Sequence, residues 1–561
     1  MAGAIIERDL SRSSPATSCC LLRLGHSAIP EGQVVKSRYQ IRVLLFPLLG
    51  ILSACGSDAG GGGGSSSSSS SSGGSGWVSG VFLPSSSFDN MCAAPRAGTS
   101  DRQGTAADEN RWLRSWTNEL YLWYGEVTDR DPSLYTTANY FPLLKTTATT
   151  ASGQDKDKFH FTYATDVWEA LSQGGTEAGY GAEFAILAGR PPRRIVVAFT
   201  DAGSPAASQL ARGDEVLQVD GTDAVNGGLQ ADVDALNGGL FPDTTGESHT
   251  LVVRNTAGVS RTVTLTSATV THIPVPIVST FPATDGPVGY IQFNDHIATA
   301  ETPLINAVNQ LKTANVRDLI LDLRYNGGGY LDLASELAYM IGNHTLTAGQ
   351  TFEKIVFNSK NPTRNPVTGE TLSPTLFHNT SQGFSTTIPT GTALPTLDLN
   401  RVYVIIGPGT CSASESIINS LRGVNVQVFV IGSTTCGKPY GFYPTDNCGT
   451  TYFTIQFRGE NAANFGDYTD GFSPANQTTA VGTTVAGCSV ADDFTHAMGD
   501  AAESRIAAAL AFRASNNQTC PVASGFAPPV LSKASTFGDG GPGLEVSKPA
   551  ARLNRIVRFG T

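Results

Sequence analysis

The fold is decided by the stretch RVYVIIGPGTCSASESII, which occupies residues 401–418. It begins as an apolar, β-branched run of strand length, and the Gly-Pro-Gly sequence at 407–409 ends that run. Apolar residues then recur at helical spacing, as at Ile417 and Leu421. The pattern predicts a strand, a tight turn and a helix. Such a turn places Ser412 at the positive end of a helix, among backbone N–H groups that can hold a negative oxygen.

Two interpretations of this serine follow from its neighbours. Ser412 and Glu415 fit a capping box, in which the serine caps the helix and the glutamate accepts from the serine N–H. Most Ser-x-x-Glu sequences have only that structural role. In the other interpretation Ser412 is a nucleophile, with Ser414 as the alternative nucleophile. The rest of the chain has to distinguish them.

Length and composition narrow the class of protein. The chain has 561 residues, which is too long for one ordinary core and predicts several domains. Hydrophobic residues make up 40% and charged residues 15%, as in globular proteins. A formal net charge of -11 without a basic stripe in the body of the chain argues against a nucleic-acid partner. Cysteines and histidines lack zinc spacing, so we expect neither a metal nor another cofactor.

The N-terminal region reads as an export signal. A basic segment at 36–42 precedes the apolar run 43–52, which is too short to span a bilayer. The sequence LSAC at 52–55 resembles a bacterial lipobox, which makes Cys55 the expected lipidation site. We therefore interpret residues 1–55 as a lipoprotein signal region, with an ordinary cleaved signal peptide as the alternative.

A tether follows this signal. Residues 56–76 are almost entirely glycine and serine, a composition typical of a flexible linker. The membrane is thus an expected partner through the lipid anchor, and the resemblance to Gram-negative lipoproteins favours the outer membrane of the cell envelope. Because residues 1–34 precede a normal-looking signal, translation is expected to start at Val34 or Val35.

The cysteine count agrees with export. An even number in an exported chain suggests disulfides. Of the pairings available, we favour Cys436 with Cys448, which bracket a loop containing glycine and proline. Besides Cys55, the cysteines of the expected mature protein are Cys92, Cys411, Cys436, Cys448, Cys488 and Cys520.

Residues 77–173 are expected to form an N-terminal helical domain. Residues 108–126 carry apolar side chains at helical spacing, among them Trp112 and Trp116, and predict an amphipathic helix whose aromatic face belongs to the core. Further helical stretches lie near 136–148 and 166–173.

Residues 174–272 are β-rich and resemble a PDZ domain. The segment AGSPAASQLARGDEVLQVDG at 202–221 matches the PDZ signature, including a Ser-Pro-Ala-Ala sequence expected to start a helix. The resemblance implies that substrate C-termini bind by adding a strand to the sheet edge, unless the fold serves only as a hinge or lid. The carboxylate-binding loop would then comprise Gly179, Tyr180, Gly181 and Ala182. Strands are predicted at 194–199, 215–220, 250–254 and 261–266.

Residues 273–525 show an α/β pattern. The buried strand 319–323 runs into RYNGGG at 324–329, whose glycines allow close backbone approach to a ligand. No Gly-Lys-Ser/Thr follows, so this is not a phosphate loop. Residues 342–396 are expected to be a surface insertion of hairpins. The other predicted elements are strands at 288–293 and 426–431 and helices at 301–313, 331–341 and 501–510.

Taken in order, these motifs resemble the C-terminal processing, or tail-specific, serine peptidases, which use a Ser–Lys dyad. The resemblance covers roughly residues 108–515. It is carried by the PDZ signature, DLRYNGGG at 322–329, SASE at 412–415, TCGK at 435–438, DGFSP at 470–474 and Asp492-Asp493 before the last helix.

The resemblance implies roles for individual residues. Ser412 would be the nucleophile and Lys438 the general base, with the backbone N–H groups of Ala413 and Gly328 holding the oxyanion. An uncharged lysine requires its pKa to fall by about 3 units, or about 4 kcal/mol, and burial near apolar strands is the expected cause. The chain departs from the family pattern at Phe442, where many members carry a glutamine, and at Pro439 and Cys436. Glu415 is then only a candidate accessory residue.

The expected fold is therefore α/β, with a crotonase/ClpP-like ββα catalytic core, an inserted β-rich PDZ domain and an N-terminal helical segment. The expected function is a serine endopeptidase that acts on polypeptides of the periplasm or envelope, recognised through their C-termini. The alternatives are a catalytically inactive, PDZ-containing peptide-binding lipoprotein and a crotonase-like acyl-CoA enzyme. Residues 526–561 are expected to be a C-terminal tail, basic from about 540 to 561, without an assigned role.

Overall fold

The computed structural model describes residues 77–478, 480, 482–524, 546 and 555–556. The predicted signal region, Cys55 and the Gly/Ser tether lie outside the described residues. Within those ranges, no helix combines the length and the apolar character needed to cross a membrane.

The N-terminal helical segment packs its tryptophan face against the α/β domain. Helix α1 (Ala106–Leu120) begins at a capping box, in which Asp108 accepts from the Thr105 N–H at 3.0 Å. Trp112 and Trp116 stack at 5.1 Å and contact Tyr452 of strand β22 (Thr450–Phe453), which confirms their core role. Strand β22 also pairs with β3 (Phe161–Ala164), so this segment joins the α/β domain by a sheet as well as by packing.

The expected helix at 136–148 is wrong. Only one turn forms, as α2 (Thr137–Tyr140), followed by the 3-10 turn η4 (Phe141–Leu143). Pro142 lacks an N–H donor, so an α-helix cannot continue through it undisturbed. The third expected helix is confirmed as α3 (Thr165–Gly174).

The β-rich domain is inserted between two paired strands. Strands β4 (Thr176–Gly179) and β11 (Ala268–Thr271) are antiparallel neighbours at its start and end. Between them, the strand order is β10-β9-β7-β6-β5, which leaves β5 at an edge. The Ser-Pro-Ala-Ala helix is wrong, because residues 203–209 form successive turns. The elements are β5 (Ala182–Ala188), β6 (Arg194–Thr200), β7 (Glu215–Val219), β8 (Thr222–Asp223), α4 (Gln230–Leu240), β9 (Ser248–Arg254) and β10 (Ser260–Thr266).

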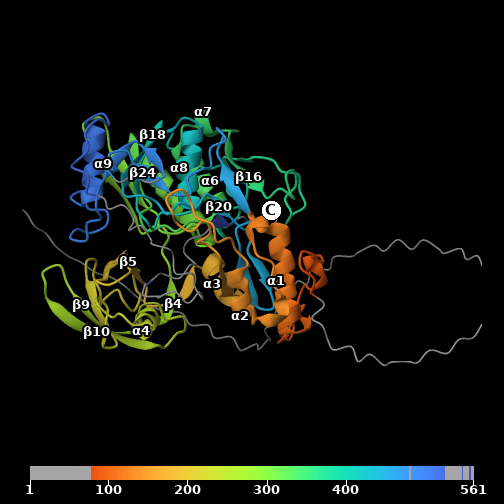
Figure 1. Cartoon of the computed structure of the whole chain (residues 1–561). Helices are drawn as coiled ribbons and strands as arrows, with labels where there is room; N and C mark the ends of the chain where they lie inside the picture. Colours follow the sequence, from red (N-terminus) through yellow and green to blue (C-terminus); the bar gives the residue numbers. More distant parts are fainter. Residues whose placement is uncertain (1–76, 479, 481, 525–545, 547–554, 557–561) are drawn as a thin grey trace, which may run out of the picture. The chain divides into compact units, whose positions relative to one another are not determined.

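The α/β domain is built on a six-stranded sheet of order β12-β13-β14-β18-β19-β26, parallel from β13 onward. Figure 1 labels strand β18 of this sheet and the helices α6, α8 and α9. Its strands are β12 (Ile277–Phe281), β13 (Val288–Gln292), β14 (Asp318–Asp322), β18 (Arg401–Ile406), β19 (Gln427–Gly432) and β26 (Gly487–Ser489). Its helices are α5 (Glu301–Thr313), α6 (Leu331–Ile341), α8 (Ala413–Gly423) and α9 (Ser504–Ala514).

Side chains of the central strand alternate between two cores, as the period of a β-strand requires. Val402 and Val404 of β18 face the core that includes α5, α6 and α8, whereas Tyr403 and Ile405 face α9. The predicted α/β fold with an inserted β-rich domain is confirmed.

The expected insertion at 342–396 supports the strand that follows Lys438. It contains α7 (His344–Thr347), β16 (Thr351–Phe357) and β17 (Thr375–Leu376). Strand β16 pairs with β23 (Phe457–Glu460), which pairs in turn with β20 (Tyr440–Gly441). The other short elements are η1 (Ser85–Ser87), β1 (Met91–Cys92), β2 (Arg102–Gln103), η2 (Tyr124–Glu126), η3 (Pro132–Leu134), η5 (Ala298–Ala300), β15 (Gly329–Tyr330), β21 (Thr445–Asn447), β24 (Phe472–Pro474), β25 (Thr483–Val485) and β27 (Arg555–Ile556).

Two buried glutamates, Glu301 and Glu336, share a backbone donor. The Gln382 N–H donates to Glu301 at 2.8 Å and to Glu336 at 2.7 Å, and both carboxyl groups are fully buried. Burial, followed by the neighbouring Glu301, raises the pKa of Glu336 to about 9. Glu336 is therefore protonated in the folded protein at neutral pH, since two carboxylates this close cannot both ionise cheaply.

The raised pKa of Glu336 predicts that the folded protein loses stability as the pH rises. The folded pKa of about 9 lies above the ordinary 4.5, so Glu336 binds more protons in the folded state between those values. Its stabilising contribution is complete below the unfolded pKa and declines as the pH rises towards the folded pKa. Urea unfolding of the wild type and of Glu336→Gln between pH 6 and 10 measures this. The free energy of unfolding should fall less with rising pH in the variant than in the wild type. Equal slopes of that free energy against pH would contradict a protonated Glu336.

Candidate active site

The predicted strand, turn and helix are present, and the turn packs against the glycine loop. Strand β18 ends at Ile406, and the Thr410 hydroxyl accepts from the Gly407 N–H and donates to the Leu323 carbonyl at 2.8 Å. A Cβ at Gly409 would lie 2.8 Å from the Arg324 carbonyl oxygen, so this approach requires glycine. The serine turn and the end of β14 are therefore in direct contact.

Ser412 itself has an unusual backbone and an unused hydroxyl. Its φ of 60° and ψ of -115° are uncommon for a residue other than glycine, and such strain often occurs at functional sites. The side chain is fully buried, and its Oγ has no hydrogen-bond partner among the residues that the structure describes. Only the glutamate half of the capping box forms, because Glu415 accepts from the Ser412 N–H at 2.9 Å. Most buried hydroxyl groups are hydrogen-bonded, so an unsatisfied one on a strained turn calls for an explanation.

Lys438 is buried among aromatic rings. Its side chain is 0% exposed, and its Nζ lies 4.4 Å from the ring centre of Phe442 and 4.7 Å from that of Phe159. Loss of water disfavours a charged amine, whereas the ring faces attract a cation, so the two effects oppose one another. Phe442 thus contributes a ring face to the lysine. It stands at the position where many members of the family that the chain resembles carry glutamine.

Glu415 joins the serine turn to the lysine turn. One oxygen accepts from the Ser412 N–H at 2.9 Å and the Lys438 N–H at 2.8 Å. The other accepts from the Thr435 hydroxyl at 2.5 Å and the Gly437 N–H at 2.9 Å. Burial raises the pKa of Glu415, while these donors act in the opposite direction. The carboxyl group thereby fixes the backbones of Ser412 and Lys438 relative to each other.

A disulfide makes the same connection covalently. Cys411, directly before Ser412, is bonded to Cys436, with their Cα atoms 5.2 Å apart. The sulfur atoms of these cysteines and the Glu415 carboxylate lie close enough together to hold a metal ion, but the disulfide uses both sulfur atoms.

The expected Cys436–Cys448 pair is therefore wrong. The other disulfides are Cys92–Cys448 and Cys488–Cys520. Because β18 and β19 are parallel neighbours, the turns that follow them lie at the same sheet edge, and this brings Cys411 to Cys436.

The glycine loop is tied to the serine turn by Asn326. Its carbonyl oxygen accepts from the Cys411 N–H at 3.1 Å and the Ser414 hydroxyl at 3.0 Å. Its side-chain oxygen accepts from the Gly328 N–H at 2.9 Å. The two expected oxyanion donors thus differ in whether their N–H is already hydrogen-bonded. The Gly328 N–H donates to Asn326. Ala413 is the first residue of α8, where an N–H lacks an intrahelical acceptor. Ser414 is occupied by its bond to Asn326, which favours Ser412 as the nucleophile.

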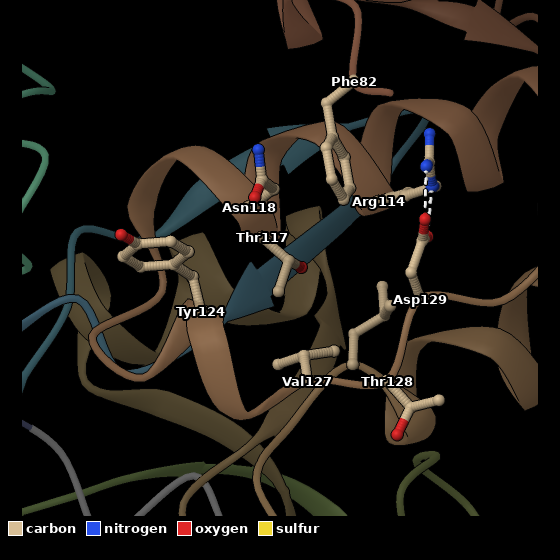
Figure 2. A pocket seen from close by; sticks show the side chains of 9 residues that line it. Phe82, Arg114, Thr117, Asn118, Tyr124, Val127, Thr128 and Asp129 are labelled. Atoms are coloured by element: carbon tan, nitrogen blue, oxygen red, sulfur yellow. Dashed lines mark hydrogen bonds and ion pairs between the residues drawn. The ribbon is translucent and has the colours of Figure 1, made fainter. Parts of the chain in front are cut away.

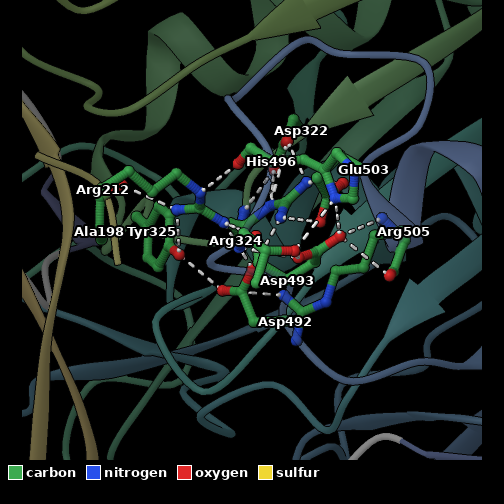
Figure 3. Close-up of polar contacts among 12 residues, drawn as sticks. Ala198, Arg212, Asp322, Arg324, Tyr325, Asp492, Asp493, His496, Glu503 and Arg505 are labelled. Carbon is green, nitrogen blue, oxygen red and sulfur yellow. Dashed lines mark hydrogen bonds and ion pairs between the residues drawn. The ribbon is translucent and has the colours of Figure 1, made fainter. Parts of the chain in front are cut away.

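A buried ionic network joins this loop to the inserted domain (Figure 3). Arg324 pairs with Asp322, Glu503 and Asp492 at 2.8 to 2.9 Å. Arg212, from the PDZ-like signature, donates to the Tyr325 hydroxyl at 3.0 Å and to Asp492 at 2.9 Å. Burial opposes ionisation of Asp492, but the surrounding guanidinium groups hold its pKa well below the ordinary range.

The predicted peptide-binding loop lies at the start of the edge strand β5. Gly179 ends β4, Gly181 has a φ of 69°, and Ala182 begins β5. Tyr180 is buried, and its hydroxyl donates to the Gly239 carbonyl at 3.1 Å.

Sequence reasoning missed Phe159, whose ring lies against Lys438, and its neighbour Lys158. Phe159 contacts Lys438 and also lies 5.7 Å from the Nζ of Lys158. Burial lowers the pKa of Lys158, against the attraction of Glu415 and Asp470. Both residues come from the N-terminal segment, and no motif marks them.

A small pocket in the N-terminal segment carries no such chemistry (Figure 2). Its volume is about 20 Å³, which suits a single water. The buried Thr117 hydroxyl, which has no hydrogen-bond partner among the described residues, lines it beside the Arg114–Asp129 ion pair.

Comparisons with known proteins agree with this arrangement. A carboxyl-terminal-processing protease from Picosynechococcus sp. is 27% identical over 239 residues, which are 42% of this chain and 49% of that relative. The alignment thus spans about half of the relative's length. A Bacteroides fragilis protein described as an S41 protease has a similar fold, with a TM-score of 0.52 and 20% identity over 72% of this chain and 98% of that one. The PDZ domain of a Vibrio cholerae carboxy-terminal protease is 23% identical over 17% of this chain and 99% of its own, with a TM-score of 0.14.

The family model of peptidase family S41 matches residues 287–442, which contain the glycine loop, Ser412, Glu415 and Lys438. The chain therefore carries a domain of peptidase family S41, matched over residues 287–442.

Proposed function

We propose that the chain is a serine endopeptidase of the C-terminal processing type, in which Ser412 is the nucleophile and Lys438 the general base. The observation that carries the proposal is the buried, unpaired hydroxyl of Ser412 on a strained helix-entry turn. Glu415 and the Cys411–Cys436 disulfide hold that turn against the turn of Lys438.

In the reaction, the uncharged Lys438 amine accepts the Ser412 proton as Oγ attacks the substrate carbonyl. The tetrahedral oxyanion receives hydrogen bonds from the Ala413 N–H and the Gly328 N–H, each donor contributing about 3 kcal/mol. For this, Gly328 has to release Asn326, a peptide rotation that glycine allows. The protonated lysine then gives its proton to the leaving amine, and an acyl-enzyme forms. Water, deprotonated by the same amine, hydrolyses that ester and restores Ser412.

The substrates in this proposal are polypeptides of the cell envelope. The edge strand β5 and the loop from Gly179 to Ala182 would receive a substrate C-terminus by strand addition. A lipid on Cys55 and the Gly/Ser tether would hold the enzyme at the outer membrane, with its body in the periplasm or at the cell surface.

The test compares the wild type with Ser412→Ala on an unfolded protein, with products identified by mass spectrometry. The wild type should produce internal cuts and the variant none. Ser420→Ala is the matched control, because Ser420 lies within α8 and, like Ser412, is buried with a hydroxyl that lacks a described partner. Cleavage by Ser412→Ala at the wild-type rate would refute the proposal. Peptide binding without cleavage by the wild type would instead support the inactive binding lipoprotein.

A further inference from the structure

A short strand near the end of the chain lies beside the glycine loop. Strand β15, which begins directly after Gly328, has His296 on one side, since the Tyr330 N–H donates to the His296 carbonyl at 2.8 Å. Its other side pairs in parallel with β27, in the register Gly329 with Arg555 and Tyr330 with Ile556. Both sides of the strand are therefore occupied within the chain.

Strand β27 also reaches the side of the site where Lys438 lies. β27 also lies against β20, which begins two residues after Lys438. It is thus placed between the glycine loop on one side and the strand that follows the base on the other. The strand therefore lies next to the loop that carries the assigned oxyanion donor Gly328 and next to the strand that follows the assigned base Lys438.

A second residue of the C-terminal region contacts the inserted domain. The Val546 N–H donates to the Gly189 carbonyl at 3.1 Å, directly after the edge strand β5. The Val546 side chain is 1% exposed and belongs to the core cluster of that domain. Substrate was expected to add along β5 from the loop at its start, and Val546 contacts the opposite end of that strand.

We propose that the C-terminal segment of the chain is its own internal ligand, which pairs with the strand beside Gly329, is anchored by Val546 just past the end of β5, and restrains the peptidase. This inference rests on the proposed function. Main-chain pairing allows such binding without a particular side chain at β27. Because the segment is attached to the enzyme, its effective concentration is high, and a free substrate has to displace it.

The test removes main-chain pairing at β27. In the double variant Arg555→Pro/Ile556→Pro, proline supplies no N–H and disfavours pairing, whereas Arg555→Ala/Ile556→Ala keeps the backbone donors. The proline variant, and a chain that ends at Asn554, should cleave an unfolded protein with kcat/KM raised about tenfold or more. The alanine variant should remain close to the wild type. Equal kcat/KM for the wild type, the proline variant and the shortened chain would overturn the proposal.

A second measurement separates this inference from the proposed function. In a Ser412→Ala background, hydrogen exchange of residues 327–331 should be faster in the proline variant than in the alanine variant. Exchange reports docking even if the protein cleaves nothing, so equal exchange would refute docking and leave the proposed function standing. A synthetic peptide of residues 543–561 should inhibit the shortened chain, and its proline counterpart should not. Melting temperatures of all variants establish that each is folded.

Discussion

Lys438→Met should reduce kcat by about 10³- to 10⁴-fold without unfolding the protein, because the amine assigned to accept the Ser412 proton is removed. Methionine has a similar length and no charge, so it suits the space between Phe159 and Phe442. Lys438→Arg should be equally inactive, since a guanidinium group does not release its proton near neutral pH. Cleavage of an unfolded protein and thermal unfolding, measured on the same preparations, separate lost chemistry from lost structure.

The matched control for this loss is Lys158→Met. It removes an amine that faces the same Phe159 ring but that has no role in the proposed reaction. We expect its kcat to stay within a few-fold of the wild type. Full activity in Lys438→Arg would show that the amine does not accept the proton. If Lys158→Met lost as much kcat as Lys438→Met, the loss would come from a change in the surroundings of both lysines and not from removal of a proton acceptor.

Much of the catalytic fold could be predicted because local signals coincide with element ends. The helices α5 and α6 have the predicted bounds, since apolar periodicity and flanking turns agree there. The turn that carries Ser412 follows from a β-branched run, a Gly-Pro-Gly break and helical spacing. The insertion of the β-rich domain followed from its signature.

The parts that sequence reasoning missed depend on which segments meet in space. The Cys411–Cys436 bond requires that β18 and β19 be parallel neighbours, and proximity in sequence favoured the wrong partner, Cys448. Phe159 reaches Lys438 from an N-terminal segment whose own pattern indicates only helix and core. The position of β27 beside Gly329 has no sequence signal, because main-chain pairing needs none.

Glu415→Ala should destabilise the protein by about 3 kcal/mol or more and abolish cleavage. The change leaves four donors without their acceptor, namely the Ser412, Gly437 and Lys438 N–H groups and the Thr435 hydroxyl, in a site without exposed surface. Urea unfolding measures the first effect and cleavage of an unfolded protein the second. Because the disulfide still joins the two turns, we expect a folded but less stable protein.

Glu415→Gln distinguishes the hydrogen-bond clamp from simple packing. Glutamine fills the same volume but offers one acceptor oxygen, and its NH₂ group faces donors that it cannot satisfy. We therefore expect stability between those of the wild type and Glu415→Ala, with cleavage reduced well below wild type because the Ser412 and Lys438 backbones are no longer fixed by one group. If both variants unfolded at the wild-type urea concentration and cleaved at the wild-type rate, the disulfide alone would suffice to position the two turns. Glu415 would then be a buried capping residue without a part in the reaction.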